Sequence, residues 1–563
     1  MRSFLCFIYL FFLSVIFNNP VNAQTNLISG SLQSVDYEGT EKYPYWGLYH
    51  KTPISEVKPA EWVTKDTIRA GWDWSLPSFV KPAAKSNLCI ARNGGLDSEK
   101  IEKLPKVNFL CNPVIAHWVN WSLLEPEEGK INFQPLINNI KLASLKGYGS
   151  IVRIHFSATT FAPELIRKYD IPIRKENSKN PPKVTNYEIS HPEFHKLYLK
   201  FIDALGKSGI PQMKEVKGLF FGYASPSYGD EGIGPFPEGM ADANDTIRHV
   251  RERIDAWAKA CAGVEYKVIM GGLSNYGLSK GFGIRRGFVE MYLYHIPDEH
   301  IGQKIDPNGY LYVDELNPII ANNVYNGEEN EEYDEVWATE ARGYRFGQTT
   351  ESYPYRYFTS NLRLLQMRCN DLLANEFSLL PEMLAWVGLE LGKNIGDTPD
   401  AWCFLRESYL KVNGGTNVKN FERWLYQRDI PGYETTPAVK IEHPIQMWMV
   451  QPGKYYDFIA REGKRIGFDI DDKWTGLKDS VAIKVSYLDT SSGELNLVYN
   501  NGNKPERKIA KLNGDGKLKT ATFFISRLKA NSLPYNFDFA LEAGSNTEKI
   551  TVSIVRVIRL KEG

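Results

Sequence analysis

The feature that most restricts the fold of this chain is a repeated alternation of short apolar runs with longer amphipathic segments. The apolar runs have the length of buried strands, and they are 115–121, 150–156, 216–223, 266–272 and 319–325. The segments between them carry apolar residues at three- and four-residue spacing, which is typical of helices, and they include 133–146, 192–207 and 245–261. Strand-then-helix units of this length imply an α/β fold with a parallel sheet, and so many of them favour a closed (β/α)8 TIM barrel over a doubly wound sheet.

The C-terminal part of the chain has a different pattern. From about residue 440, short strands with alternating apolar residues follow one another between turns, which is typical of an antiparallel β-sandwich. We therefore predict a barrel domain over 24–435, a linker near 429–437 and a sandwich over 440–563. Trp448 and Trp474 are candidate sugar platforms in the sandwich, although core packing is the commoner use of such residues.

The N-terminus predicts export. Arg2 precedes an apolar run over 4–17, and small residues end at Ala23, which is the pattern of a secretory signal peptide over 1–23. The run is too short to span a membrane, so we expect no membrane insertion and a secreted or periplasmic protein.

Charge and cysteine content exclude several classes of partner. The chain has 67 basic and 67 acidic residues and no long basic run, so a nucleic-acid partner is not expected. No glycine-rich phosphate-binding motif and no zinc-like Cys/His spacing is present, and we predict no cofactor and no metal. Five cysteines remain after the signal peptide, of which Cys89 and Cys111 are the candidate bridge. The oligomeric state cannot be read from these patterns.

A first motif follows the strand near residue 115. It reads His117-Trp118-Val-Asn-Trp121-Ser-Leu-Leu-Glu-Pro-Glu-Glu-Gly. It resembles the early strands of the barrel glycoside hydrolases that include the family 42 β-galactosidases and the β-amylases. The resemblance implies a sugar-cleaving barrel with a carbohydrate substrate, and it places His117, Trp118 and Trp121 as candidate cleft residues. Glu125 and Glu127 are expected to cap a surface loop.

A second motif follows the strand over 216–223. The stretch Ser227-Tyr-Gly-Asp-Glu-Gly-Ile-Gly-Pro235 resembles the β-amylase segment in which an acid at the end of strand four precedes a proline by four residues. The resemblance makes Glu231 the candidate proton donor, with Asp230 as its rival. Phe221, Tyr223 and Tyr228 would line the barrel mouth and raise the pKa of that acid by desolvation.

Glycoside hydrolysis needs a second carboxylate across the cleft. The expected strand over 319–325 is followed by an acidic run, from which we favour Glu329 over Glu328, with Glu340 as the next candidate. A solvated acidic loop is the usual alternative.

Other polar residues near strand ends are candidate substrate contacts. Arg286 and Glu290 belong to the segment expected to form strand six, although a structural ion pair is the commoner explanation of such an acid as Glu290. Arg153 and His155 are two residues apart and should share one strand face.

Three functions are compatible with these residues. The first is a secreted glycoside hydrolase that acts on a poly- or oligosaccharide with two carboxylates. The second is a noncatalytic glycan-binding barrel, suggested by the ambiguous acids. A polysaccharide lyase is the third and weakest.

Overall fold

The structure is a computed structural model. It describes residues 32–33, 73–104, 107, 110–156, 163–175, 185–187, 191–221, 243–271, 274–286, 301–330, 353–374, 381–410, 416–447, 450–474, 476 and 480–561. The signal-like segment over 1–23 therefore lies outside the described residues.

Eight parallel strands close into a barrel in the order β10-β13-β14-β3-β4-β5-β8-β9, which confirms the predicted fold class. Their bounds are β3 Asn87–Gly94, β4 Pro113–Asn120, β5 Gly149–His155, β8 Val216–Phe221, β9 Val268–Met270, β10 Gly283–Arg286, β13 Asn326–Asn330 and β14 Asp371–Ala374. Each strand pairs with its chain neighbours, and β14 closes the ring against β3. The carboxyl ends of the eight strands therefore surround one mouth.

One predicted strand is wrong. The run over 319–325 begins with a short helix, α10 (Pro318–Ala321), and the strand starts only at Asn326. Asn317 caps this helix by accepting a hydrogen bond from the Ile319 backbone, and Pro318 stands at its first turn, where its missing N–H costs nothing. The acids expected in a loop thus lie within β13 itself.

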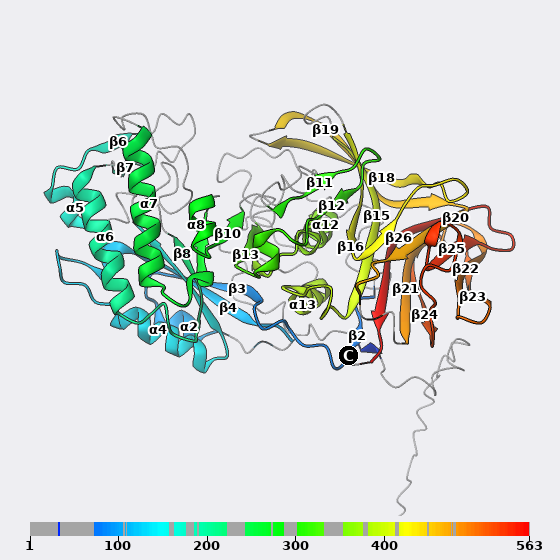
Figure 1. The fold of residues 1–563 in the computed structure, drawn as a ribbon, viewed down its shortest axis with the longest axis horizontal. Helices are drawn as coiled ribbons and strands as arrows, with labels where there is room; N and C mark the ends of the chain where they lie inside the picture. Colours follow the sequence, from blue (N-terminus) through cyan, green and yellow to red (C-terminus); the bar gives the residue numbers. More distant parts are fainter. Residues whose placement is uncertain are drawn as a thin grey trace, which may run out of the picture.

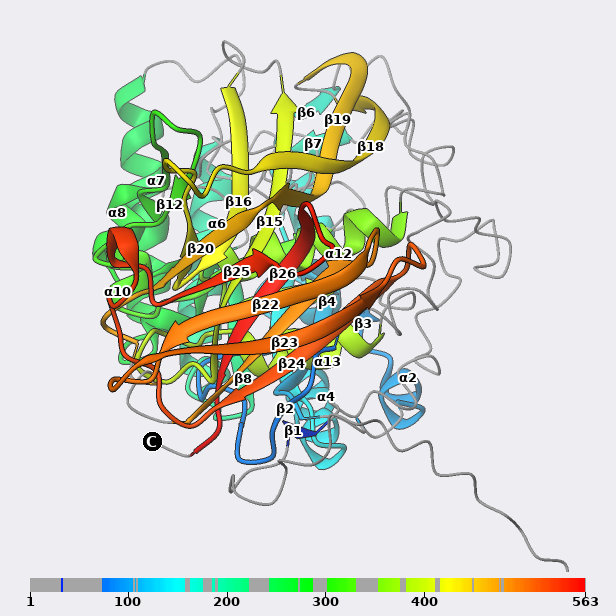
Figure 2. The ribbon, with the colours of Figure 1, turned by 90° about the vertical axis from the view of Figure 1, so that its right-hand side faces the viewer.

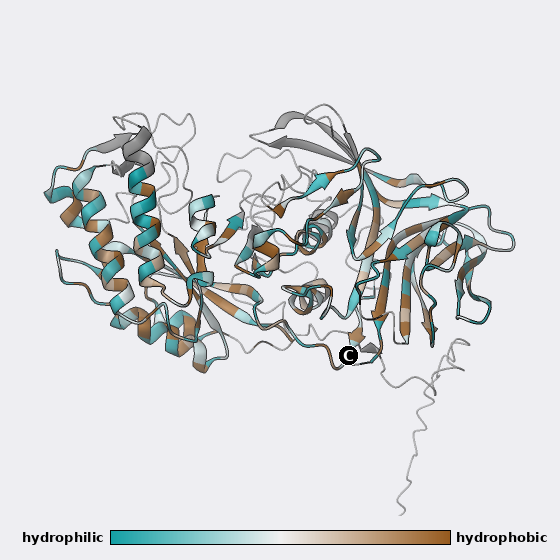
Figure 3. Cartoon of the chain, in the orientation of Figure 1, coloured by the Kyte–Doolittle hydropathy of each residue, from teal (hydrophilic) through white to brown (hydrophobic). Residues whose placement is uncertain are grey.

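Amphipathic helices cover the β4–β9 side of the barrel. The predicted helices are confirmed as α4 (Gln134–Leu145), α6 (Pro192–Lys207) and α7 (Ala243–Ala260). They lie at one end of the molecule (Figure 1), and the bands of brown and teal along α6 and α7 in Figure 3 show their two faces. The core beneath them is rich in aromatic residues, including Trp121, Phe156, Phe201 and Trp257.

Shorter elements connect these units. The helices are α2 Ser98–Glu102, α3 Trp121–Leu124, α5 Glu164–Lys168, α8 Asn275–Ser279, η4 Glu265–Lys267 and η8 Pro534–Asn536. The short strand pairs are β1 Leu32–Gln33 with β2 Leu76–Pro77, β6 Ile173–Lys175 with β7 Thr185–Tyr187, and β11 Lys304–Ile305 with β12 Leu311–Tyr312.

Two antiparallel sheets form the predicted C-terminal sandwich, which Figure 2 views from the side away from the barrel. One sheet contains β15 Asp400–Leu410, β16 Thr416–Arg423, β18 Thr436–Met447, β19 Val450–Gly463, β21 Val481–Leu488, β24 Leu518–Ile525 and β26 Ile550–Arg559. The other contains β17 Leu425–Gln427, β20 Arg465–Ile470, β22 Ser492–Asn500, β23 Pro505–Asn513 and β25 Phe539–Ala543. The sandwich therefore begins at Asp400, earlier than the predicted boundary near 440.

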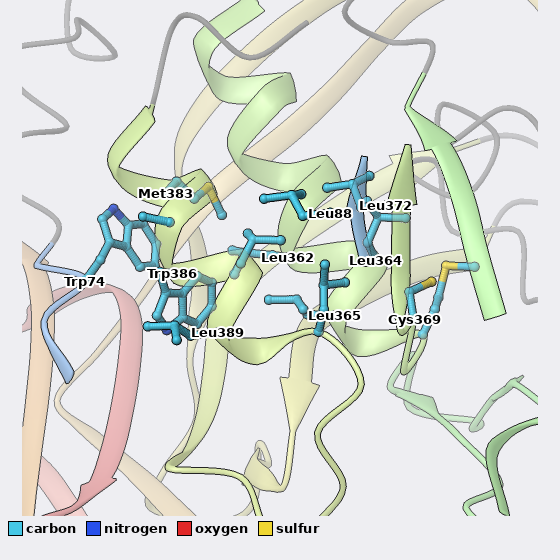
Figure 4. Packing of buried hydrophobic residues seen from close by; sticks show 14 of the residues in the cluster. Trp74, Leu88, Leu362, Leu364, Leu365, Cys369, Leu372, Met383, Trp386 and Leu389 are labelled. Carbon is cyan, nitrogen blue, oxygen red and sulfur yellow. The ribbon is translucent and has the colours of Figure 1, made fainter. Parts of the chain in front are cut away.

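The barrel and the sandwich share one hydrophobic core. Helices α12 (Tyr353–Gln366) and α13 (Pro381–Glu390) cover β14 and β3 and also pack against the sandwich. Figure 4 shows Trp74, Leu88 and Trp386 in this cluster, which continues into Trp402 and Ile558 of the sandwich. The sandwich therefore buttresses the barrel directly.

Several predictions about single residues can be decided here. Cys89 and Cys111 are both free, so the expected bridge is wrong. Trp474 is buried and donates to the Thr398 carbonyl, so it is a core residue and not a sugar platform. Trp448 lies outside the described residues. None of the described helices is long and apolar enough to cross a membrane.

Candidate active site

The lower part of the barrel interior is apolar. Inward positions alternate along each strand, and those near the amino ends form a compact cluster with Cys89, Val114, Ile151, Ile269 and Tyr325. This packing closes the barrel below, so the polar chemistry lies toward the carboxyl ends of the strands.

Trp118 lies above this apolar cluster, between two guanidinium groups. The strands on either side of β4 are β3 and β5, and they bring Arg92 and Arg153 to the indole. The Arg92 and Arg153 Cζ atoms lie 4.4 and 4.5 Å from the Trp118 ring centroid. Trp118 is half-buried, and its ring faces are contacted by guanidinium groups, so we expect it to orient these groups more than to stack on a sugar.

The same layer continues around the barrel. The Arg153 Cζ atom is 4.9 Å from the Phe220 ring centroid, and the Arg285 Cζ atom is 5.9 Å from it on the other side of β9. The His155 ring lies 5.8 Å from Trp118. Arg153 and His155 thus share the inward face of β5, as predicted, while their role toward a substrate stays a prediction.

A buried acid lies at the base of this layer. Asp371, the first residue of β14, accepts a hydrogen bond from the Tyr325 hydroxyl. Both side chains are buried, and burial raises the pKa of Asp371 to about 7 despite the hydrogen bond from Tyr325. Asp371 is in register with Gly327, where a side-chain carbon would overlap the Tyr325 ring.

The two candidate acids of β13 occupy alternate positions. Glu328 pairs with Leu372, whose side chain belongs to the core shared with the sandwich. Glu329 is two residues after Gly327 in β13, and its backbone is in register with Leu373. The backbone of Arg286 is in register with Glu328. The side chains of Glu328, Glu329 and Arg286 lie outside the described residues, so their roles stay predictions.

Two predicted cleft residues are elsewhere. His117 points to the helix side of β4, is fully buried and hydrogen-bonds Ser150 at 3.0 Å, and burial lowers its pKa to about 4. Trp121 is fully buried and donates to Glu125 at 2.8 Å. Both are packing residues because they face outward from the barrel, and neither is brought together with Trp118.

Glu125 and Glu127 of the first motif make contacts within their own loop. Glu125 is buried and accepts from Trp121 and from the Gly129 backbone, while Glu127 is exposed and pairs with Lys130. Phe221, expected at the mouth, instead belongs to the helix-side core, and its neighbour Phe220 faces inward.

Several of the candidate site residues lie outside the described residues: Tyr223, Tyr228, Asp230, Glu231, Glu290 and Glu340. Strand β10 ends at Arg286, before Glu290. The sequence reasoning missed Arg92, Phe220, Arg285, Tyr325 and Asp371. Of these residues, only Asp371 could have been recognised from the sequence, because it begins a short apolar run typical of a strand, after a helical segment.

No family model matches the chain, and no curated protein matches it. The similar solved structures are glycoside hydrolases, and no single family is assigned among them.

Three of these structures illustrate the likeness. An exo-β-1,4-mannosidase from Opitutaceae bacterium strain TAV5 is 11% identical with a TM-score of 0.25, and the match covers 38% of this chain and 41% of that one, less than half of its length. The β-amylase catalytic domain from Paenibacillus polymyxa is 8% identical with a TM-score of 0.31, over 54% of this chain and 98% of that one. A family 30 subfamily 8 xylanase from Clostridium acetobutylicum is 10% identical with a TM-score of 0.29, over 85% and 98%.

Proposed function

We propose that this protein is a secreted glycoside hydrolase that cleaves a poly- or oligosaccharide with a pair of carboxylates. The observation that carries the proposal is the place of Glu329 in the backbone: it is the fourth residue of barrel strand β13, near the strand's carboxyl end and two residues after Gly327, which is in register with the buried Asp371. Active sites of (β/α)8 barrels lie at this end of the strands.

Glu329 is the proposed nucleophile or general base, and Glu231 is the proposed general acid. A glycosidase needs one carboxyl group to protonate the leaving oxygen and a second carboxylate on the other side of the sugar. Strand β8, which precedes Glu231 in the chain, and β13 are separated in the ring by β9 and β10, so they face each other across part of the barrel. We propose that the sugar binds between the carboxyl ends of these two strands.

The layer around Trp118 supports binding of a polar ligand. Arg92, Arg153 and His155 supply hydrogen-bond donors from neighbouring strands, and the aromatic rings fix their planes. Rigid donors of this kind suit the hydroxyl groups of a sugar.

The test is product release from a broad panel of plant and algal glycans, measured by mass spectrometry. Wild type should release saturated products, and Glu231→Gln and Glu329→Gln should each lose about 10²–10⁴-fold in kcat. Unsaturated products would establish a lyase instead, and glycan binding without any product would establish a binding protein.

Export is a separate part of the proposal. The intact mass of the protein recovered from the periplasm or the medium should match a chain that begins at Gln24. Retention of residues 1–23 in a cytoplasmic product would contradict it.

A further inference from the structure

The outer face of the second sandwich sheet carries a cluster of aromatic residues. This sheet consists of β17, β20, β25, β22 and β23, and it lies on the side of the sandwich away from the barrel (Figure 2). The cluster is distinct from the sandwich core and contains Tyr433, Phe537 and Ala540, with Ile430 and Leu533 packed against them.

Small residues of the sheet form the base on which Phe537 packs. Gly467 of β20 is in register with Ala540 of β25. The residues before and after each of them belong to the sandwich core, so by alternation Gly467 and Ala540 face outward. A side-chain carbon at Gly467 would overlap the Phe537 ring. The Phe537 ring therefore lies directly against the outer face of the sheet.

Tyr535 extends this cluster into solvent. The Tyr433 ring centroid lies 5.1 Å from that of Phe537 and 6.2 Å from that of Tyr535, and both contacts are edge-to-face. Tyr433 and Phe537 are 6% and 3% exposed, whereas Tyr535 is 58% exposed. Two buried rings thus support a third ring that presents its surface to solvent.

The backbone holds Tyr535 in this position at a conformational cost. Tyr535 has φ 62° and ψ 23°, and Asn536 has φ 64°, so two successive residues adopt the left-handed region. Asparagine tolerates this region, but it is unfavourable for tyrosine. The loop is anchored by the Asp538 carboxylate, which accepts hydrogen bonds from the backbone of Asn531 at 2.7 Å and of Ile470 at 2.6 Å. An exposed ring at a strained position adds little to the core, so we attribute it to binding.

Charged side chains lie beside the aromatic cluster. Glu542 pairs with two arginines: its Oε1 atom is 3.4 Å from Arg465 Nε, and its Oε2 atom is 3.5 Å from an Arg507 terminal nitrogen. The side chains of Arg465 and Arg507 are 50% and 57% exposed. Burial raises the pKa of Tyr433, and the nearby charges of Arg465 and Glu542 act on it in opposite directions. The exposed ring is therefore bordered by polar groups and not by further apolar surface.

We propose that Tyr535 is the platform of a glycan-binding surface on the sandwich. The apolar face of a sugar ring stacks on the tyrosine, and Arg465 and Glu542 contact its hydroxyl groups. A sugar has this combination of an apolar face and a polar rim. A stable protein interface buries about 800 Å² on each partner, which is far more than one exposed ring offers. The surface is separate from the barrel mouth, although its ligand class, a glycan, rests on the proposed function.

The test measures binding of the full-length protein to soluble polysaccharides by affinity electrophoresis. The probes are starch, xylan, galactomannan, mixed-linkage β-glucan and laminarin, and wild type should be retarded by at least one of them. Tyr535→Gly removes the ring and relieves the left-handed strain. It should weaken that binding about tenfold while its melting temperature stays at or above that of wild type. Tyr535→Phe keeps the ring and should bind as wild type does.

A second exposed tyrosine supplies the control. Tyr266 is 41% exposed and lies in η4 of the barrel, so Tyr266→Ala should leave the retardation unchanged. No retardation of wild type by any of these polysaccharides would overturn the inference. A wild-type dimer that Tyr535→Gly dissociates in sedimentation velocity would also overturn it, because the ring would then be a contact between two copies of the chain.

This result does not depend on whether the barrel is catalytic. Retardation that requires Tyr535, in a protein that cleaves no glycan, would support the platform and contradict only the proposed hydrolase. Cleavage by wild type, together with equal retardation of wild type and Tyr535→Gly, would overturn the platform and leave the hydrolase standing.

Discussion

The two sides of the barrel complete their hydrophobic surfaces in different ways. On the β4–β9 side, the barrel's own helices α4, α6 and α7 close an aromatic core that contains none of the described sandwich residues. On the β14–β3 side, α12 and α13 lie between the barrel and the sandwich, and one core runs through all three layers. On the β14–β3 side the sandwich therefore covers apolar surface that would otherwise face solvent, and this burial stabilises the barrel.

Buried charges reinforce the junction side. Arg423 of the sandwich pairs with Glu390 at the end of α13 at 2.9 Å, and both side chains are almost completely buried. Arg556 pairs with Asp400 at 2.7 Å, and Lys484 pairs with Asp73 from the segment that precedes the barrel. The Arg423–Glu390 and Lys484–Asp73 pairs connect the sandwich to α13 and to the segment before the barrel, whereas the Arg556–Asp400 pair lies within the sandwich.

The largest expected effect comes from the junction core. Trp386 is fully buried with its ring centroid 4.8 Å from that of Trp74 and 6.2 Å from that of Trp402. Trp386→Ala should cost about 3–5 kcal/mol and lower the melting temperature of both domains together in calorimetry. Trp257→Ala, of similar burial beneath α6 and α7, is the control. If Trp386→Ala destabilised only the barrel, the shared core would be refuted.

The buried ion pair gives the next effect. Arg423→Met leaves Glu390 buried without its partner, and burial already raises the pKa of that carboxyl well above its usual value. We expect a loss of about 3–5 kcal/mol in denaturant unfolding. The double variant Arg423→Met with Glu390→Gln should recover much of this loss, because no unpaired charge remains. Additive losses would show that the two residues act independently.

The buried acid inside the barrel should make stability depend on pH. The folded-state pKa of Asp371 is raised to about 7 from its ordinary value of 3.8, so the folded state binds the proton more tightly than the unfolded state. Its contribution to stability is therefore full below about pH 4 and is lost as the pH rises toward 7. Asp371→Asn should flatten the fall in unfolding free energy between pH 4 and 7 by a few kcal/mol. An unchanged pH profile would contradict the assignment.

The smallest effect is steric. A methyl group at Gly327 would overlap the Tyr325 ring, so Gly327→Ala should cost about 1–3 kcal/mol. Tyr325→Leu in the same background should relieve part of the cost, because the ring is then absent. Thermal melts of wild type and these two variants measure both effects, and a Gly327→Ala protein as stable as wild type would argue against the inward stacking of Tyr325.

The regular parts of the fold could be predicted from the sequence. Helix α6 has the predicted bounds of 192–207, since its apolar spacing, its initial proline and its length agree. Strands β4 and β5 were likewise visible as apolar runs longer than six residues. Periodicity is informative over such lengths.

Short or polar elements could not be predicted in the same way. Strands β10 and β14 have four residues each, which is too short to show a periodic pattern of apolar residues. The first strand of the sandwich, β15, contains Arg406 and Glu407, whose burial depends on partners distant in the sequence, so the domain boundary was placed too late. The choice of Glu329 depended on where β13 begins, and the arginine layer depended on which strands are neighbours. Both are properties of the closed barrel and not of any local pattern.

The most direct test of the central claim compares two adjacent acids on one strand. Glu329→Gln and Glu328→Gln make the same chemical change at neighbouring positions of β13, and successive residues of a strand alternate between its two faces. On a glycan that wild type cleaves, kcat should fall about 10²–10⁴-fold in Glu329→Gln and stay close to wild type in Glu328→Gln. Full activity in Glu329→Gln would contradict the account. An equal loss of kcat in both variants would also contradict it, provided that both keep the thermal stability of wild type.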